Sequence, residues 1–125
     1  MKVLPMIKAL FASAPRISPA DCAARVRSGE AILIDVREPS EWARGVVQSA
    51  RRLSLTDLVG ARTRWKPFLA EAQGRELLLY CAVGGRSGVA ARILVNEGFR
   101  AANAGAITEW TTAGWPLEKE PSAGS

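Results

Sequence analysis

Hydrophobic residues gather in two short, continuous runs along the chain. The first run is Ala-Ile-Leu-Ile-Asp-Val at residues 31–36, and the second is Glu-Leu-Leu-Leu-Tyr-Cys at residues 76–81. Apolar runs of this length are typical of strands that are buried on both faces of a parallel sheet. We therefore predict two central strands at these positions, and a shorter third strand at residues 99–102.

The segments around these runs carry helix signals. Ser18, followed by a proline, predicts the start of a helix that runs to about Arg27, and Gly29 predicts its end. Further helical segments are expected at residues 39–44, 56–73 and 107–112. Within the second of these, Pro67 predicts a break, because proline cannot donate to the helical hydrogen-bond ladder.

A longer helix is predicted over residues 87–97. It would turn Val89, Ile93 and Leu94 toward the core and stop at Gly98. Strands that alternate with helices favour an α/β fold, in which helices cover both faces of a parallel sheet. The functional crevice of such a sheet lies beyond the carboxyl ends of its strands.

Length and composition fit one globular domain. The chain has 125 residues, of which 48% are hydrophobic and 23% are charged. We expect the domain to span residues 17–118, after a lead-in at residues 1–16 and before a tail at residues 119–125. The lead-in has some features of a secretion signal, but it is short and Lys8 interrupts its apolar part. No run approaches the length of a membrane span, so we expect no membrane partner.

Cys81 ends the second apolar run and precedes a loop with two glycines and then a helix. Free backbone N–H groups and the positive end of the helix dipole meet at such a place and favour an anion. We therefore expect Cys81 to be partly thiolate near neutral pH, and hence nucleophilic.

The amino-acid composition excludes several kinds of catalytic and metal site. Histidine is absent, which excludes Cys–His and Ser–His–Asp nucleophile pairs and zinc sites that need imidazole. The pKa of Cys81 must then be lowered by backbone dipoles and Arg86. Cys22 has no metal-ligand spacing to Cys81 and is expected to be a small buried residue, although a disulfide between the two stays open. We expect no cofactor and a reducing, cytoplasmic compartment.

The net charge of +5 is concentrated in one segment, residues 44–66, which contains a single acid, Asp57. Its basic residues are Arg44, Arg51, Arg52, Arg62, Arg64 and Lys66. The segment could attract an anionic substrate or an acidic partner protein, or it could form a solvated positive surface. No nucleic-acid-binding motif accompanies these charges, so we expect no nucleic-acid partner.

Three segments, in this order, resemble the rhodanese-like domains, the single-domain sulfurtransferases. They are LIDVREPSEW at residues 33–42 with Gly45, YCAVGGRS at residues 80–87, and NAG at residues 103–105 through Trp110 with GWP at residues 114–116. The resemblance covers residues 17–117 and implies a rhodanese-like three-layer fold. The chain departs from the family at Val46, where histidine is frequent, and at residues 52–54, where Asn-Ile-Pro is frequent.

The resemblance also implies a function and a site. Cys81 would take a sulfane sulfur from a donor such as thiosulfate or a persulfide, hold it as a persulfide, and pass it to a thiol or to cyanide. The loop that would bind the sulfur consists of Ala82, Val83, Gly84, Gly85, Arg86 and Ser87. In this loop we expect Arg86 to add a fixed charge or to brace the backbone, and Ser87 to cap the following helix. Gly84 and Gly85 are expected where the turn needs positive φ or close backbone approach.

Other functions remain open at this point. The spacing from Cys81 to Arg86 is C-x4-R, whereas the related phosphatases and arsenate reductases have the longer C-x5-R loop, so sulfur is favoured over an oxyanion. A sulfur carrier or docking module, in which Cys81 moves sulfur for a partner, is a further alternative.

Asp35 and the tryptophans have structural and functional interpretations. Asp35 is either an acid near the sulfur site or a strand-end carboxylate that accepts hydrogen bonds from backbone or Arg37. We favour the second, because an acid beside a thiolate would raise the pKa of the thiol. The four tryptophans are expected to be packing anchors. They are Trp42, Trp65, Trp110 and Trp115.

Overall fold

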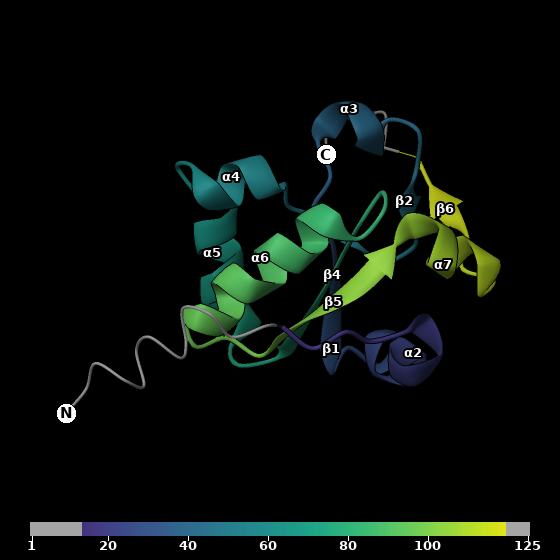
Figure 1. Ribbon diagram of the computed structural model, residues 1–125, viewed down its shortest axis with the longest axis horizontal. Coiled ribbons are helices and arrows are strands. Elements are labelled where there is room, and N and C mark those ends of the chain that lie inside the picture. Colours follow the sequence, from purple (N-terminus) through teal and green to yellow (C-terminus); the bar gives the residue numbers. More distant parts are fainter. Residues whose placement is uncertain (1–13, 120–125) are drawn as a thin grey trace.

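A four-stranded parallel sheet has the strand order β3-β1-β4-β5. Its strands β1, β4 and β5 lie at the centre of the molecule (Figure 1). The structure is a computed structural model and describes residues 14–119. The strands are β1 (Ala31–Asp35), β3 (Arg51–Arg52), β4 (Glu76–Cys81) and β5 (Ala101–Ala106). Most of the expected lead-in and tail, residues 1–13 and 120–125, lies outside the described residues.

The two predicted central strands are confirmed. Every residue of β1 is buried, as are five of the six residues of β4, because both strands have neighbours on each side and helices above and below. The third predicted strand exists but begins two residues later and extends further, to Ala106. A small antiparallel pair, β2 (Val46–Val47) and β6 (Leu117–Glu118), was not predicted, nor was β3.

Three helices cover one face of the sheet. They are α4 (Leu55–Val59), α5 (Trp65–Ala72) and α6 (Gly85–Asn96). Their core contains alternate residues of the central strands, such as Ile32 and Leu79, together with Trp65 and Leu94. This packing follows from the strand geometry, since successive side chains of a strand point to opposite faces.

Two helices, α2 (Pro19–Ser28) and α7 (Ile107–Thr112), cover the other face, so the predicted α/β fold with helices on both faces is confirmed (Figure 1). Their core contains Leu33 and Tyr80 from the sheet, with Cys22 and Trp110 from the helices. All four tryptophans are buried and serve as the expected packing anchors. Among the described residues, no helix is both long enough and apolar enough to span a membrane.

The predicted caps of α2 are confirmed. Ser18 is the N-cap and its hydroxyl accepts a hydrogen bond from the Asp21 N–H at 3.4 Å. Gly29 closes the helix with φ +85°, a left-handed conformation that glycine adopts without strain. The predicted helix at residues 39–44 is a single turn, α3 (Pro39–Trp42).

The predicted break at Pro67 is wrong in its position. The helical region divides between Val59 and Trp65, and Pro67 is the third residue of α5. The first N–H groups of a helix have no partner inside the helix, so a proline there removes no hydrogen bond. Proline at this position is therefore compatible with the helix.

The start and one face of α6 also differ from the prediction. The helix begins at Gly85, and Gly84 is its N-cap, so Ser87 does not cap it. Val89 is 38% exposed and does not face the core as predicted. Leu94 is fully buried and Ile93 packs against the core, as predicted.

Candidate active site

Cys81 ends β4 and is completely buried, and the loop that follows wraps around its sulfur. The Gly84 N–H donates to Sγ at 3.0 Å and the Ser87 N–H donates at 3.4 Å. The Ser87 hydroxyl lies 3.3 Å from the same sulfur. The loop and the first turn of α6 therefore direct three donors at one atom.

These hydrogen-bond donors change the pKa of the Cys81 thiol. Burial alone would raise its pKa, because a charged sulfur is disfavoured away from water. Hydrogen bonds from the hydroxyl and N–H of Ser87, and from the N–H groups of Gly84 and Val83, outweigh burial and lower the pKa of Cys81. The thiolate form of Cys81 is thus stabilised without any histidine.

Cys22 provides an internal comparison. It is equally buried, and burial raises its pKa to about 11 although Arg25 lies nearby. Its thiol donates to the Ser18 carbonyl at 3.3 Å, so it acts as a donor and accepts no comparable set of hydrogen bonds. Both cysteines are free, so the disulfide that the sequence left open does not form.

Arg86 binds Glu41 on α3. The two guanidinium nitrogens lie 2.6 and 2.9 Å from the two carboxylate oxygens. This hydrogen bonding lowers the pKa of Glu41 to about 2 and raises the pKa of Arg86. Of the two roles expected for Arg86, these contacts correspond to bracing the backbone. The negative charge of Glu41 offsets the positive charge of the loop.

Ser87 and Asn103 connect the loop to β5. Ser87 is fully buried, and its Oγ lies 2.7 Å from Asn103 Oδ1 as well as 3.3 Å from the Cys81 sulfur. Asn103 Oδ1 also accepts from the Gly105 N–H at 3.0 Å, and its Nδ2 donates to the Gly84 carbonyl at 3.1 Å. One amide thus holds both the loop and the hydroxyl that contacts the sulfur.

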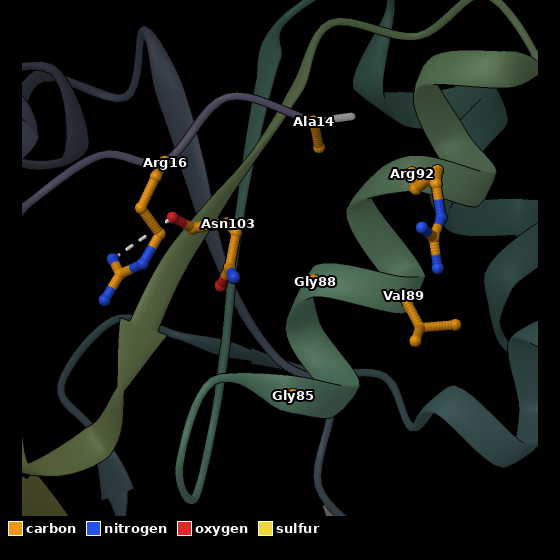
Figure 2. A pocket seen from close by; sticks show the side chains of 7 residues that line it. All are labelled: Ala14, Arg16, Gly85, Gly88, Val89, Arg92 and Asn103. Atoms are coloured by element: carbon orange, nitrogen blue, oxygen red, sulfur yellow. Dashed lines mark hydrogen bonds between the residues drawn. The ribbon is translucent and has the colours of Figure 1, made fainter. Parts of the chain in front are cut away.

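A groove of about 270 Å³ runs along α6 beside this network. Figure 2 shows the Asn103 side chain between β5 and α6, next to Gly88. A Cβ atom at Gly88 would lie 3.2 Å from Asn103 Nδ2, which is a tight contact. The close approach of α6 to β5 therefore depends on a small residue at this position.

The other loop residues take different roles from one another. Gly84 has φ +97°, as predicted for a glycine that the turn requires. Gly85 is helical and a Cβ there would meet nothing within 4 Å, so the predicted requirement for glycine at Gly85 is wrong. Ala82 is half-buried, whereas Val83 is 86% exposed at the tip of the loop.

Asp35 is a structural carboxylate, as favoured from the sequence. It is completely buried and accepts hydrogen bonds from the Arg37 guanidinium at 2.9 to 3.1 Å and from the Arg37 N–H at 2.9 Å. The Trp42 indole N–H donates to it at 3.3 Å. These contacts fix the chain between β1 and α3.

The contacts made by Glu41 and Asn103 were not predicted from the sequence. Both belong to segments that carry the family resemblance, but each acts through a partner far along the chain, Arg86 and the residues 84–87 loop respectively. Membership of these segments was the available signal, since Glu41 lies on α3 after β1 and Asn103 is the third residue of β5. Within residues 14–119, no cluster of three or more histidine, cysteine or acidic side chains could hold a metal ion.

Comparison with known proteins agrees with this geometry. The family model for the rhodanese-like domain matches residues 18–113. A curated sulfurtransferase of Allochromatium vinosum is 31% identical over 90 residues, which cover 70% of this chain and 78% of that protein.

Solved structures give the same result. A rhodanese-related protein from Thermoplasma volcanium superposes with a TM-score of 0.70 at 26% identity, covering 85% of this chain and 99% of that chain. A Rhodopseudomonas palustris protein of unknown function, described as a possible tyrosine phosphatase, has the same TM-score and identity and covers 93% of each chain. The present chain belongs to the rhodanese-like domain family.

Proposed function

We propose that the protein is a rhodanese-type sulfurtransferase that carries sulfur on Cys81. The observation that carries this proposal is the set of three donors directed at the Cys81 sulfur, which lower its pKa. A thiolate is the nucleophilic form of cysteine, so this environment prepares Cys81 to attack. The curated relative is itself a sulfurtransferase, which supports the same assignment.

In the first step, the Cys81 thiolate attacks the outer, sulfane sulfur of a donor. A new S–S bond forms at Cys81 while the bond between the sulfane sulfur and the rest of the donor breaks. Thiosulfate would leave as sulfite, and a persulfide donor would leave as its thiolate, so the negative charge is conserved. The product is a Cys81 persulfide anion.

In the second step, an acceptor attacks the outer sulfur of that persulfide. Cyanide would become thiocyanate, and a small thiolate or the cysteine of a protein would become a persulfide, while the Cys81 thiolate returns. Two sequential displacements of this kind predict ping-pong kinetics.

The loop would stabilise both anions by the same means. Hydrogen bonds to charged groups contribute roughly 1.5–3 kcal/mol each, so two or three of them offset the cost of burying a thiolate. Val83, Gly84 and Ser87 supply these N–H groups, and the Arg86–Glu41 pair holds the start of α6 in place. We also propose a reducing, cytoplasmic location, since both cysteines are free thiols.

A phosphatase is the second candidate, because of the description of the Rhodopseudomonas palustris structure. Two contacts argue against it here. Arg86 is bound to both carboxylate oxygens of Glu41, so its guanidinium would have to leave that carboxylate in order to hold an oxyanion. Glu41, with its pKa lowered to about 2, is ionised at neutral pH and cannot protonate a leaving group.

A sulfur carrier would use the same persulfide but would exchange sulfur with a protein partner in preference to small molecules. Turnover with small donors far slower than with a protein donor would favour the carrier. Thiocyanate formation from thiosulfate and cyanide, measured beside hydrolysis of an aryl phosphate, separates a sulfurtransferase from a phosphatase. We expect thiocyanate and no phosphate release from the wild type and from Cys22→Ser, and neither product from Cys81→Ser. Phosphate release that depends on Cys81, without thiocyanate, would overturn the proposal.

A further inference from the structure

A second groove, of about 360 Å³, lies beside β3 at one edge of the sheet. Its walls come from β3 and from the first turns of α5. Three arginines line it, Arg51, Arg52 and Arg64, and the single acid among its lining residues is Glu71. We call this the β3 groove.

The basic residues of the segment 44–66 differ in whether an acidic side chain binds them in the structure. Arg62 is bound by Glu97 at 2.8 and 2.7 Å and does not line the groove. Asp57, the one acid of the segment, accepts hydrogen bonds from three backbone N–H groups, those of residues 63–65. Arg64 is exposed and makes no ion pair with any residue of the described range 14–119. Arg51 is paired with Glu71 at 3.1 Å, so the exposed Arg64 is the positive charge of the lining that an acidic partner could engage.

The base of the β3 groove is apolar. Leu53 and Phe68 line it and are largely buried, and the Arg51 guanidinium lies 5.5 Å from the centre of the Phe68 ring. A small inorganic anion would use the arginines but leave this apolar wall without a partner. A peptide that combines carboxylates with apolar side chains matches both parts of the lining.

The groove also adjoins an open strand edge. At the other edge of the sheet, residues 15–17 run along β5, since the Asn103 N–H donates to the Pro15 carbonyl and the Ile17 N–H donates to the Asn103 carbonyl. No described segment runs along β3 in this way. An uncovered edge strand can pair with an extended peptide, whose side chains then enter neighbouring pockets.

The groove and Cys81 lie at the same end of the sheet. Arg52 is opposite Asp35 in the parallel register, and Asp35 is opposite Tyr80, the residue before Cys81. A protein bound in the β3 groove would thus lie at the same end of the sheet as Cys81.

We propose that the β3 groove binds an extended acidic segment of a partner protein. This inference goes beyond the sulfurtransferase function and does not depend on it, because binding requires the arginines and the strand edge and not the thiol. Charge complementarity identifies the partner as acidic, and the apolar base together with the open edge identifies the bound part as an extended peptide.

The test is fluorescence anisotropy with a labelled peptide of about ten residues that alternates glutamate with valine and leucine, which is long enough to reach from the β3 edge along the groove. The full chain is used with Cys81→Ser, so that sulfur chemistry does not contribute. We expect binding that weakens as salt rises and that is lost when glutamine replaces each glutamate of the peptide.

Three variants make the test specific. Arg64→Glu is expected to weaken binding at least about fivefold, and Glu71→Gln to tighten it about twofold, because one removes and the other unmasks positive charge. Arg92→Glu is the matched control, since Arg92 is equally exposed and lies on α6, outside the β3 groove, and we expect a change below about twofold. Opposite shifts in Arg64→Glu and Glu71→Gln cannot arise from partial unfolding.

Three results would overturn the inference: no binding by the wild-type groove, equal losses in Arg64→Glu and Arg92→Glu, or tighter binding of a single-stranded RNA of equal charge with the same dependence on Arg64. Sulfur uptake, measured on the same variants with Cys81 intact, is expected to stay unchanged. That measurement reports on the sulfurtransferase function separately from peptide binding.

Discussion

Ser87 has one hydroxyl proton, and its Oγ lies within 3.5 Å of four acceptors, namely Asn103 Oδ1, the Cys81 sulfur and the carbonyls of Gly84 and Gly105. Asn103 Oδ1 lies 2.7 Å away and the Cys81 sulfur 3.3 Å away. When Cys81 ionises, its sulfur becomes the stronger acceptor, and Asn103 Oδ1 retains the Gly105 N–H as its donor. The hydroxyl can therefore turn to the thiolate without leaving a buried acceptor unsatisfied.

Ser87→Ala tests this contribution. Removing the hydroxyl is expected to raise the pKa of Cys81, because one of the hydrogen bonds that lower it disappears. At neutral pH the rate of alkylation should fall roughly three- to tenfold, the effect of losing one hydrogen bond to a charged group. The rate is measured against pH in a Cys22→Ser background, with Ser28→Ala, an exposed serine, as the control. An unchanged pH profile in Ser87→Ala would contradict the assignment.

Val83 is the residue through which donor preference can be changed. Its side chain is 86% exposed at the tip of the loop, and the one charge of the loop, Arg86, is offset by Glu41. A dianion such as thiosulfate is then attracted mainly by backbone N–H groups. We expect thiosulfate to be a weakly bound donor of the wild type.

Val83→Arg should lower the KM for thiosulfate by roughly three- to tenfold and leave kcat nearly unchanged, with an effect that fades as salt rises. Steady-state thiocyanate formation measures both constants. Val83→Gln, which adds length without charge, is the control and should behave like the wild type. A KM that stays the same or rises in Val83→Arg would show that the loop does not attract the donor by charge.

At the scale of elements, the Arg86–Glu41 pair joins α6 to α3. Glu41 also accepts a hydrogen bond from the Glu38 N–H at 3.0 Å, at the start of α3. The carboxylate thus fixes its own helix turn and the first turn of the helix whose N–H groups face Cys81. Because its partner is 45 residues away in the chain, the pair closes a long-range contact.

Glu41→Gln should destabilise the protein in a pH-dependent way. The folded pKa of about 2 lies below the ordinary value of 4.5, so the stabilisation is complete above about pH 4.5 and is lost as pH falls toward about 2. The side chains of Arg86 and Glu41 are 35% and 25% exposed, so solvent screening reduces the expected loss at pH 7 to about 1–2 kcal/mol.

Urea unfolding at neutral pH and near pH 3 measures this effect. The difference between wild type and Glu41→Gln should shrink at the lower pH, because protonation of Glu41 weakens the pair in the wild type as well. Glu71→Gln is the control, since its ion pair with Arg51 is 56% and 47% exposed and should contribute only about 0–1 kcal/mol at either pH. A difference that persists unchanged near pH 3 would contradict the assignment.

Some elements of the fold could be predicted from the sequence, and others could not. The central strands β1 and β4 were predictable because burial on both faces leaves a continuous apolar run. The two-residue strands β2, β3 and β6 were not, since two residues cannot show a pattern. The break predicted at Pro67 was misplaced, because a proline in the first turn of a helix removes no hydrogen bond, whereas one in the interior does.

For the site, the sequence predicted the thiol, its loop and the donors that surround it, because strand, glycines and helix are contiguous in the chain. It did not predict that Arg86 would bind Glu41, nor that Asn103 would hold the loop. Those contacts depend on the sheet order, which brings the ends of β1, β4 and β5 to one edge. The local sequence pattern does not indicate which side chains meet at the carboxyl ends of these strands.

At the scale of the whole molecule, the alternation of β4 decides where the thiol lies. Tyr80 points into the core beneath α2 and α7, where its hydroxyl accepts the Val47 N–H at 2.9 Å. Cys81, one residue later, belongs to the core on the side of α4, α5 and α6. A shift of β4 by one residue would exchange these faces and separate the thiol from the N-terminus of α6.

The two cysteines occupy opposite faces of the same sheet, and both are buried. Burial is therefore not what distinguishes them. The donors of the loop lower the pKa of Cys81, whereas burial without such donors raises the pKa of Cys22 to about 11. The fold thus shifts the pKa values of the two thiols in opposite directions in the same chain.

The central claim is that Cys81, held as a thiolate by the loop, accepts one sulfane sulfur. Intact-mass analysis after incubation with thiosulfate or a persulfide donor, followed by peptide mapping, tests it most directly. The wild type and Cys22→Ser should each gain the mass of one sulfur atom on the peptide with Cys81, and lose it again on treatment with cyanide. Cys81→Ser should gain none. A gain of equal size in Cys81→Ser, or no gain by the wild type with either donor, would contradict the account.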